Sequence, residues 1–332
     1  MAEPVNNVQV QARDTAVWPG ASADPVFVLC CGRSGSTLLR FLLDAHPDLA
    51  CPPETFLPWL CAQLVRVWNL MDTGGRENCT AVAPEVLTGV RETIDRIVGP
   101  HLSAQGKKRY CDKNLGTASH ADAVTRVFPD AKFLCLYRHP MDMIASGIEA
   151  CAWGLNSYGF DSYAAASPQN NVLAVARYWA DYTSAILSVE ERFPERCHRI
   201  RYEDLVADPE HVMGEVFSFI GVPPMPGVSS SCFTRRERIG RGDRKIWDTS
   251  KVSHTSVGRG WQVPADMIPA PATERLNSLA RKLHYVQISK GWGNGSRPDD
   301  MRVGVGQGVV SHAVEGTAKD VMTPPVSVAV TA

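Results

Sequence analysis

A strand-like apolar run that leads directly into a Gly/Ser loop is the feature that most constrains the fold of this chain. Residues 25–31 (PVFVLCC) are almost wholly apolar, as expected of a strand that is buried on both faces of a parallel sheet. The loop 32–37 (GRSGST) follows, and a helical pattern runs over residues 36–45. Because strand and helix are joined so closely, the segment predicts a strand–turn–helix unit of an α/β fold.

The same order of strand and helix recurs along the chain. An apolar run at residues 132–137 (KFLCLY) predicts a second strand, and the segment 197–202 (CHRIRY) predicts a third. Helical patterns follow at residues 141–151 and 209–220, and a longer one spans residues 171–193. This alternation is typical of a doubly wound parallel sheet, in which ligands bind at the carboxyl ends of the strands.

Composition sets the domain organisation and restricts the partners. The 332 residues are 44% hydrophobic, which is sufficient for a large core. With 34 basic and 35 acidic residues the net charge is -1, so neither a nucleic-acid surface nor a membrane surface built on bulk charge is expected. We expect a flexible arm at residues 1–24, one domain at 25–292 and a disordered, Gly- and Pro-rich tail at 293–332.

The cysteines and the amino terminus bear on the compartment. The ten cysteines include no CxxC pair, and Cys30, Cys31 and Cys135 lie inside strand-like runs. Buried free thiols explain this pattern better than a disulfide framework or a zinc site. The amino terminus lacks the basic-then-apolar order of a signal peptide, and no apolar run approaches the ~20 residues of a membrane helix. We therefore expect a cytoplasmic protein without a membrane span.

The loop 32–37 also has the composition of an anion site. Gly32 and Gly35 permit tight turns and close approach of a ligand to main-chain N–H groups, and Arg33 adds a planar cation. Hydroxyl donors come from Ser34, Ser36 and Thr37. A helix that starts here directs its free N–H groups and its dipole at the loop. The alternative is a Ser/Thr-capped helix start with an exposed arginine. The loop lacks the Gly-Lys-Ser/Thr ending of a Walker A sequence.

A second group of polar residues follows the strand at 132–137. Arg138 lies at the carboxyl end of this strand, and Ser146 lies eight residues later, two turns along the next helix. The two side chains can share a pocket only if a ligand bridges them. The alternative is a surface arginine and a buried serine that bonds back to its own helix.

Taken together, GRSGSTLL at 32–39 and LYRHPMDMIASG at 136–147 resemble the sulfotransferases that use 3′-phosphoadenosine-5′-phosphosulfate (PAPS). The segments AHPDLACPPE (45–54) and RYEDLVADPE (201–210) resemble the family too, and the resemblance covers roughly residues 25–265. It implies a P-loop-like three-layer α/β fold, with a central parallel sheet flanked by helices. It also implies transfer of a sulfuryl group from PAPS to an acceptor, which leaves PAP as product and requires no metal.

The resemblance implies roles for the two anion-binding groups. The loop that carries Arg33, Ser34, Gly35, Ser36 and Thr37 would bind the 5′-phosphosulfate. Arg138 and Ser146 would bind the 3′-phosphate. Arg33 occupies a position where many family members carry a lysine. An arginine can hold the leaving phosphate through two donors, but it is a poor general acid because it does not give up its proton.

The resemblance also implies a catalytic base. Glu54 in ACPPE matches the glutamate of the tyrosylprotein branch and is the leading candidate. The alternative is a glutamate that merely favours a helix start. Lys113 in CDKNLG corresponds to a lysine that neutralises the transferring group. Asn114 stands near where the animal cytosolic branch has its histidine base, and His120 is the nearest histidine.

Three further features are less specific. Tyr202 matches a tyrosine on the adenine side of the cofactor. Arg259 is the nearest match to a basic segment that closes the cofactor pocket, and a solvated basic loop is the alternative. The connection 151–171, with Trp153, Tyr158, Phe160 and Tyr163, has the character either of an acceptor-binding lid or of a satellite core.

The expected reaction is therefore sulfation of a hydroxyl, or in second place an amine, of a small or medium metabolite that is free or carrier-bound. A small-molecule kinase is one alternative, but it would need a Walker lysine and a magnesium carboxylate. A non-catalytic nucleotide-binding module is another, and it would not need Glu54 or Lys113. Neither the acceptor nor the oligomeric state can be read from the sequence.

Overall fold

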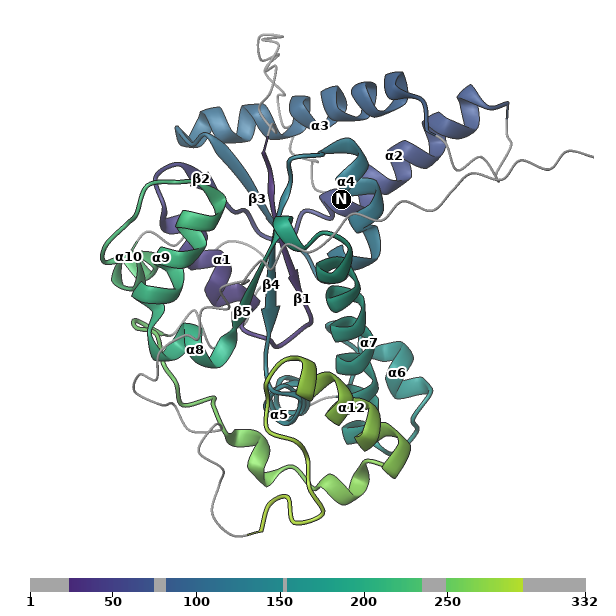
Figure 1. Cartoon of the computed structure of the whole chain (residues 1–332), viewed down its shortest axis with the longest axis vertical. Coiled ribbons are helices and arrows are strands. Elements are labelled where there is room, and N and C mark those ends of the chain that lie inside the picture. The colour runs from purple at the N-terminus through teal and green to yellow at the C-terminus, as the bar shows by residue number, and fades with distance from the viewer. Residues whose placement is uncertain (1–23, 75–81, 152–153, 235–248, 295–332) are drawn as a thin grey trace, which may run out of the picture.

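The computed structural model describes residues 24–74, 82–151, 154–234 and 249–294. The predicted arm and tail therefore lie outside the described residues, apart from their innermost positions. Five parallel strands form one sheet in the order β2-β3-β1-β4-β5 (Figure 1). Their bounds are Val26–Cys30 (β1), Leu49–Ala50 (β2), Arg109–Lys113 (β3), Lys132–Tyr137 (β4) and Cys197–Arg201 (β5).

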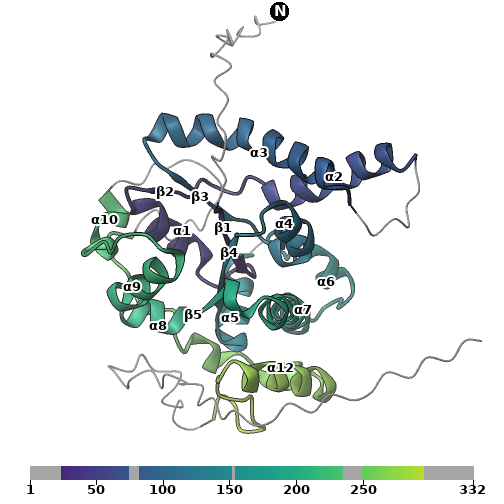
Figure 2. The ribbon, with the colours of Figure 1, turned by 45° about the horizontal axis from the view of Figure 1, so that its top comes forward.

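Helices cover both faces of this sheet (Figure 2). The α-helices are Ser36–Ala45 (α1), Leu57–Asp72 (α2), Pro84–Gln105 (α3), Ala121–Val127 (α4), Pro140–Ala150 (α5), Asp161–Ala165 (α6), Asn171–Arg192 (α7), Tyr202–Ala207 (α8), Pro209–Ile220 (α9), Val228–Thr234 (α10) and Ala270–Lys282 (α12). Short 3₁₀ helices occur at Thr117–His120 (η1), Pro194–Arg196 (η2), Arg259–Gln262 (η3) and Ala265–Met267 (η4).

The central strand β1 shows how the layers form. Its side chains alternate between the two faces, because successive residues of a strand point in opposite directions. Val26 and Val28 pack with α1, α9 and α10, whereas Phe27 and Leu29 pack into a larger core with α3, α4, α5 and α7. Both sets are fully buried. The predicted three-layer α/β fold with a parallel sheet is therefore confirmed.

Most predicted elements lie where the sequence places them. The predicted strands at 25–31, 132–137 and 197–202 correspond to β1, β4 and β5, with at most one residue of difference at an end. The predicted helix at 36–45 corresponds to α1, and that at 171–193 to α7. The helix that joins β4 to the next element begins at Pro140, one residue before the predicted start, because proline suits a first turn.

Two remaining expectations concern cysteines and membrane spans. In the described part of the chain, Cys30, Cys31, Cys51, Cys61, Cys111, Cys135 and Cys232 are buried free thiols, and Cys151 and Cys197 are partly exposed free thiols. The prediction of buried free thiols is confirmed for that first group. None of the helices described here is long and apolar enough to cross a membrane.

Candidate active site

A cavity of about 1190 Å³ opens at the carboxyl ends of β1, β3 and β4. This is the edge at which ligands bind in doubly wound sheets. Of the predicted site residues, Ser34 and Arg259 lie outside the lining that the described residues form. The others line the cavity: Arg33, Gly35, Ser36, Thr37, Glu54, Lys113, Arg138, Ser146 and Tyr202.

The loop after β1 directs the start of α1 at this cavity. Gly35 is the N-cap and has a φ of 93°, so α1 starts on a residue that has no side chain to cap it. This rules out a Ser/Thr-capped start, and the first N–H groups of α1 face the cavity wall instead. Ser34 is fully buried, and its hydroxyl donates to the Cys31 carbonyl at 2.8 Å. Ser34 therefore supports the loop from behind.

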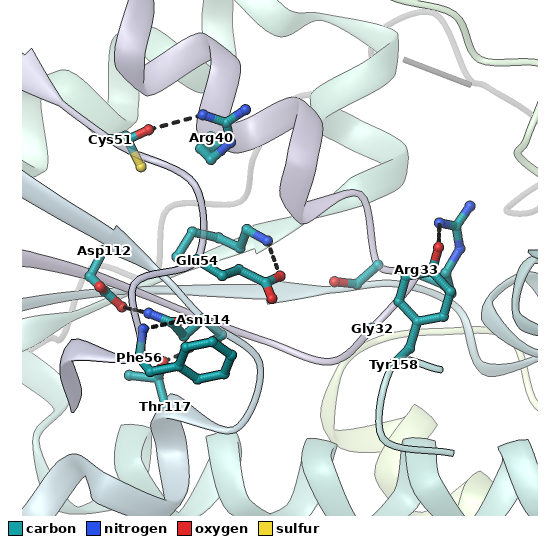
Figure 3. Close-up of polar contacts among 12 residues, drawn as sticks. Gly32, Arg33, Arg40, Cys51, Glu54, Phe56, Asp112, Asn114, Thr117 and Tyr158 are labelled. Atoms are coloured by element: carbon teal, nitrogen blue, oxygen red, sulfur yellow. Dashed lines mark hydrogen bonds and ion pairs between the residues drawn. The ribbon is translucent and has the colours of Figure 1, made fainter. Parts of the chain in front are cut away.

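Arg33 connects the loop to α5 and to the connection 151–171, and Figure 3 shows its contact with Tyr158. Its backbone has a φ of 65°, and its Nε donates to the Ser146 hydroxyl on α5 at 3.3 Å. Its Nη1 reaches the Tyr158 hydroxyl at 3.5 Å, and its guanidinium lies 5.2 Å from the centre of the Tyr158 ring. Ser146 thus contacts Arg33, whereas the sequence had paired it with Arg138.

Arg138 follows the last residue of β4 and lines the cavity. Only 3% of its surface is exposed; Nη1 donates to the Arg33 carbonyl at 2.9 Å and Nη2 to the Ser256 carbonyl at 2.7 Å. Its guanidinium stacks 4.4 Å from the centre of the Tyr202 ring. Its Nε is buried and has no hydrogen-bond partner among the described residues. A buried, unpartnered cationic donor beside a helix N-terminus fits an anionic ligand.

The predicted base, Glu54, and the predicted lysine, Lys113, form an ion pair in the cavity wall (Figure 3). Lys113 Nζ and Glu54 Oε1 lie 2.5 Å apart, and the side chains are 2% and 18% exposed, respectively. Lys113 ends β3, whereas Glu54 lies on the connection between β2 and α2. Glu54 lies three residues before α2 begins, so it is outside the first helical turn. Its side chain lines the cavity instead.

A buried polar network supports this pair from behind (Figure 3). The Asp112 carboxylate accepts hydrogen bonds from the Thr55 hydroxyl at 2.8 Å and from the Asn114 amide at 2.6 Å. The Asn114 oxygen in turn accepts the Phe56 N–H at 3.0 Å. Burial raises the pKa of the Asp112 carboxyl, and these hydrogen bonds oppose the rise. From the sequence, Asn114 was noted only because it stands near where other family members have a histidine. The hydrogen-bond network around it was not predicted.

Two predicted residues lie away from the cavity. His120 ends η1, outside the cavity lining formed by the described residues, and burial lowers its pKa. Arg259 pairs with Glu149 of α5 at 2.7 Å on the surface. In place of Arg259, residues 249–253 and 255–256 complete the cavity wall. The basic segment that contains Arg259 spans residues 241–261, and residues 241–248 of it lie outside the described residues.

The aromatic residues of the connection 151–171 fall into two groups, one that lines the cavity and one that belongs to the core. Tyr158 lines the cavity, whereas Phe160 is fully buried, with its ring 4.6 Å from that of Tyr178 on α7. Trp153 lies outside the described residues. Tyr178, which the sequence reasoning missed, accepts the Gly32 N–H at 2.8 Å, and its neighbour Tyr182 lines the cavity. Their positions in the α7 pattern were the only available signal.

Comparison with known proteins identifies relatives of this arrangement. The model of the sulfotransferase family matches residues 25–226. A protein-tyrosine sulfotransferase of Drosophila melanogaster is 28% identical over 204 residues, which is 60% of this chain and 38% of that protein. Nodulation protein NoeE of Sinorhizobium fredii (strain NBRC 101917 / NGR234) is 27% identical over 250 residues, 70% of this chain and 58% of that protein. The chain thus spans less than two thirds of the length of these relatives.

Solved structures share the fold. The sulfotransferase domain from the curacin biosynthetic pathway superposes with a TM-score of 0.58 at 22% identity, covering 80% of this chain and 99% of that one. The sulfotransferase domain from the Synechococcus PCC 7002 olefin synthase gives a TM-score of 0.56 at 22% identity, with 80% and 96% coverage. The family match covers more than half of the chain and includes both β1 with its loop and Arg138 with its helix. The chain belongs to the sulfotransferase family.

Proposed function

We propose that the protein transfers a sulfuryl group from PAPS to a hydroxyl group of a small or medium metabolite, giving a sulfate ester and PAP. One observation carries this proposal. A single cavity unites an uncapped helix N-terminus, a buried arginine with an unpartnered Nε, and a glutamate–lysine pair. The first two features suit a nucleotide that carries two separate anionic groups. The third suits an acceptor that must lose a proton.

The residues divide into a donor side and an acceptor side. The N–H groups of Ser36 and Thr37, together with Arg33, would hold the 5′-phosphosulfate. Arg138, which lines the cavity, would contact the 3′-phosphate, and Tyr202 would flank the adenine. Ser146 is within reach of Arg33 and would connect the two phosphate groups. PAPS itself supplies the sulfuryl group and a good leaving group, so the protein mainly positions the reactants and stabilises charge.

Proton balance assigns Glu54 and Lys113 to the acceptor side. The acceptor oxygen forms a bond to sulfur, the bond from sulfur to the bridging phosphate oxygen breaks, and PAP leaves with the bonding electrons. The acceptor hydroxyl proton passes to Glu54 Oε, and Lys113 stabilises the negative charge on the transferring group. Arg33 stabilises the charge that develops on the leaving phosphate.

A thermal-shift assay separates this proposal from the two alternatives. PAP and PAPS should raise the melting temperature by roughly 5–10 °C at a concentration about 100-fold above Kd, whereas ATP–Mg should not. Stabilisation by ATP–Mg alone would favour a kinase. Transfer of labelled sulfuryl groups from PAPS to a panel of hydroxylated acceptors then tests catalysis. A protein that binds PAP but transfers to none of them would be a binding module.

A further inference from the structure

Large apolar side chains that are exposed concentrate in one region. Within the described residues they are Phe56, Trp59, Val67, Trp68, Met71, Ile97 and Met267. All but Ile97 and Met267 lie between residues 56 and 71, at the start of α2 or along it. Single exposed apolar residues are ordinary, but a group of this kind marks a surface that binds something.

Phe56 connects this group to the active site. It lines the cavity two residues after Glu54, and 53% of its surface is exposed. Its φ is 57°, a left-handed conformation that a bulky residue rarely adopts. Hydrogen bonds of the Asp112–Asn114 network hold Thr55 and the Phe56 N–H in place. The surrounding residues therefore fix a strained backbone that presents an aromatic ring at the cavity mouth, beside the candidate base.

The exposed surface continues along α2. This helix reads LPWLCAQLVRVWNLMD and has only two charged residues, Arg66 and Asp72. It packs against α3, α4 and η1. Trp59, Val67 and Met71 are 51%, 54% and 76% exposed and fall on one i+4 row, whose remaining member is Gln63. From Trp59 to Met71 this row is ~18 Å long. The outer face of a helix that packs on a core is normally polar, so an apolar row there is unusual.

We propose that Phe56 and the α2 row (Trp59, Val67 and Met71) bind the apolar part of the acceptor. The acceptor would be an amphipathic molecule whose hydroxyl lies next to a hydrophobic chain. Its hydroxyl would reach Glu54, and its chain would leave the cavity over Phe56 and lie along α2. This inference rests on the proposed function and narrows its acceptor class.

The position of Phe56 favours this occupant over a second protein or a membrane. A partner that covered only the outer face of α2 would not need an aromatic ring inside the cavity, two residues from the base. The wall formed by residues 249–253 and 255–256 is mostly polar, with Ser250, Lys251 and Ser253 among its members. Phe56 and the α2 row therefore offer an apolar chain attached to the reacting hydroxyl a path that this polar wall does not offer.

The test uses 4-methylphenol, 4-butylphenol and 4-octylphenol as acceptors with saturating PAPS. For the unmodified protein kcat/KM should rise roughly two-fold per methylene, because a half-covered methylene contributes about half of the transfer free energy of a buried one. The octyl to methyl ratio would then be about 100-fold. Trp59→Ala should remove most of this ratio. Met267→Ala also deletes an exposed apolar side chain, but far from α2 in sequence, and should preserve the ratio.

Binding of 4-octylphenol to the PAP-loaded protein, measured by calorimetry, gives a readout that does not need turnover. It should weaken about ten-fold in Trp59→Ala, as expected for loss of a large aromatic contact. Measurable transfer with a flat chain-length series, or a series that Trp59→Ala leaves unchanged, would overturn the inference and leave the proposed function standing. A flat chain-length series would assign the α2 row to another occupant if Trp59→Ala abolished a second property. Loss of dimer formation would point to a second copy of the chain, and loss of binding to phosphatidylcholine vesicles would point to a membrane. Absence of both PAP binding and transfer would remove the proposed function and this inference with it.

Discussion

Four charged residues carry the proposed division of the cavity into a donor side and an acceptor side. Arg33 and Arg138 lie on the proposed donor side, and the carbonyl of Arg33 accepts a hydrogen bond from the guanidinium of Arg138. Glu54 and Lys113 face them as a close ion pair. Because Lys113 is almost fully buried, removal of its partner would leave an uncompensated charge, which links catalysis to local stability.

The first prediction concerns Glu54→Gln, which preserves shape but cannot accept a proton at neutral pH. Turnover should fall roughly 10²–10⁴-fold, the usual range for loss of a general base, while PAP binding stays near that of the unmodified protein. Steady-state kinetics and calorimetry with PAP measure the two effects. Near-normal turnover on the true acceptor would remove Glu54 from the mechanism and would favour an acceptor that is acidic enough to need no base.

The second prediction concerns Arg138→Ala. If Arg138 contacts the 3′-phosphate, the variant should lose ~1.5–3 kcal/mol of PAP binding, the scale of a charge-assisted hydrogen bond. Binding of adenosine 5′-phosphosulfate, which lacks that phosphate, should change much less. The comparison is needed because Arg138 also holds the Arg33 and Ser256 carbonyls, so a general loosening would weaken both ligands. Equal losses would make Arg138 a structural residue only.

Short sequence motifs located residues that the fold brings together. Arg33, Glu54 and Lys113 lie in such motifs and all three line the cavity, whereas their roles stay predictions. The sequence could not show that Ser34 bonds to Cys31, that Ser146 contacts Arg33, or that Arg259 pairs with Glu149. These partners are set by contacts between elements, which spacing along the chain does not encode.

On the scale of elements, α1 clamps the segment that carries Glu54. Arg40 Nη1 donates to the Cys51 carbonyl at 3.1 Å (Figure 3). The Asp44 carboxylate accepts the Cys51 N–H at 2.9 Å. The two clamping residues are four apart, and thus lie on one face of α1. Pro52 and Pro53 follow Cys51 and fix the backbone φ angles, so the clamp extends to Glu54.

The third prediction tests this clamp with Arg40→Met. Arg40 is 4% exposed, and burial lowers the pKa of its guanidinium, so an apolar side chain of similar length should be tolerated by the fold. Loss of the bond to Cys51 should displace Glu54 and lower kcat about 10- to 100-fold, as small misplacements do. The melting temperature and PAP affinity should change little. An unaltered kcat would show that the prolines alone position the base.

The fourth prediction concerns stability and pH through Asp112. Burial raises its pKa above the ordinary value of 3.8, so the folded state favours the protonated carboxyl. This contribution is fully present below that value and is lost as pH rises through the raised pKa. The free energy of unfolding of the unmodified protein, relative to Asp112→Asn, should therefore fall as the pH rises above about 4. Denaturant titrations measure it, and a rise would mean that the hydrogen bonds outweigh burial.

Elements with a clear apolar period were predictable, and the others were not. β1 and β4 are continuous apolar runs, whereas β2 has two residues and β3 reads RYCDK. The charged residues of β3 conceal a strand because they are used in the site, Lys113 in the ion pair and Asp112 in the network. Helix α2 is an exception: it was missed although Leu57, Cys61 and Val65 recur on its buried face at helical spacing.

On the scale of the whole molecule, the segment after residue 249 completes the active site from far along the chain. It packs against the start of α5, where the Asp142 carboxylate accepts the Gly258 N–H at 2.7 Å and the Gly260 N–H at 2.6 Å. Trp292 Nε1 donates to the Gly260 carbonyl at 3.0 Å and secures it from outside. In this later part of the chain, η3 packs against α5 and α12 packs against α7 (Figure 1). The same segment contains Ser256, whose carbonyl accepts one of the two hydrogen bonds that Arg138 donates.

The fifth prediction is that Gly260→Ala weakens donor binding from a distance. A Cβ at this position would lie 2.2 Å from the carbonyl carbon of Met141 and 2.4 Å from the Asp142 nitrogen, so the segment must move off α5. Because Ser256 would move with it, Arg138 should lose a hydrogen bond and PAP affinity should fall about ten-fold, the scale of one such bond. Gly291→Ala is the matched control, since its Cβ would meet only the Ser289 hydroxyl at 4.0 Å. Calorimetry with PAP well below the melting temperature of each variant separates affinity from stability. A Gly260→Ala protein that melts earlier but binds PAP normally would show that this segment stabilises the fold without shaping the donor site.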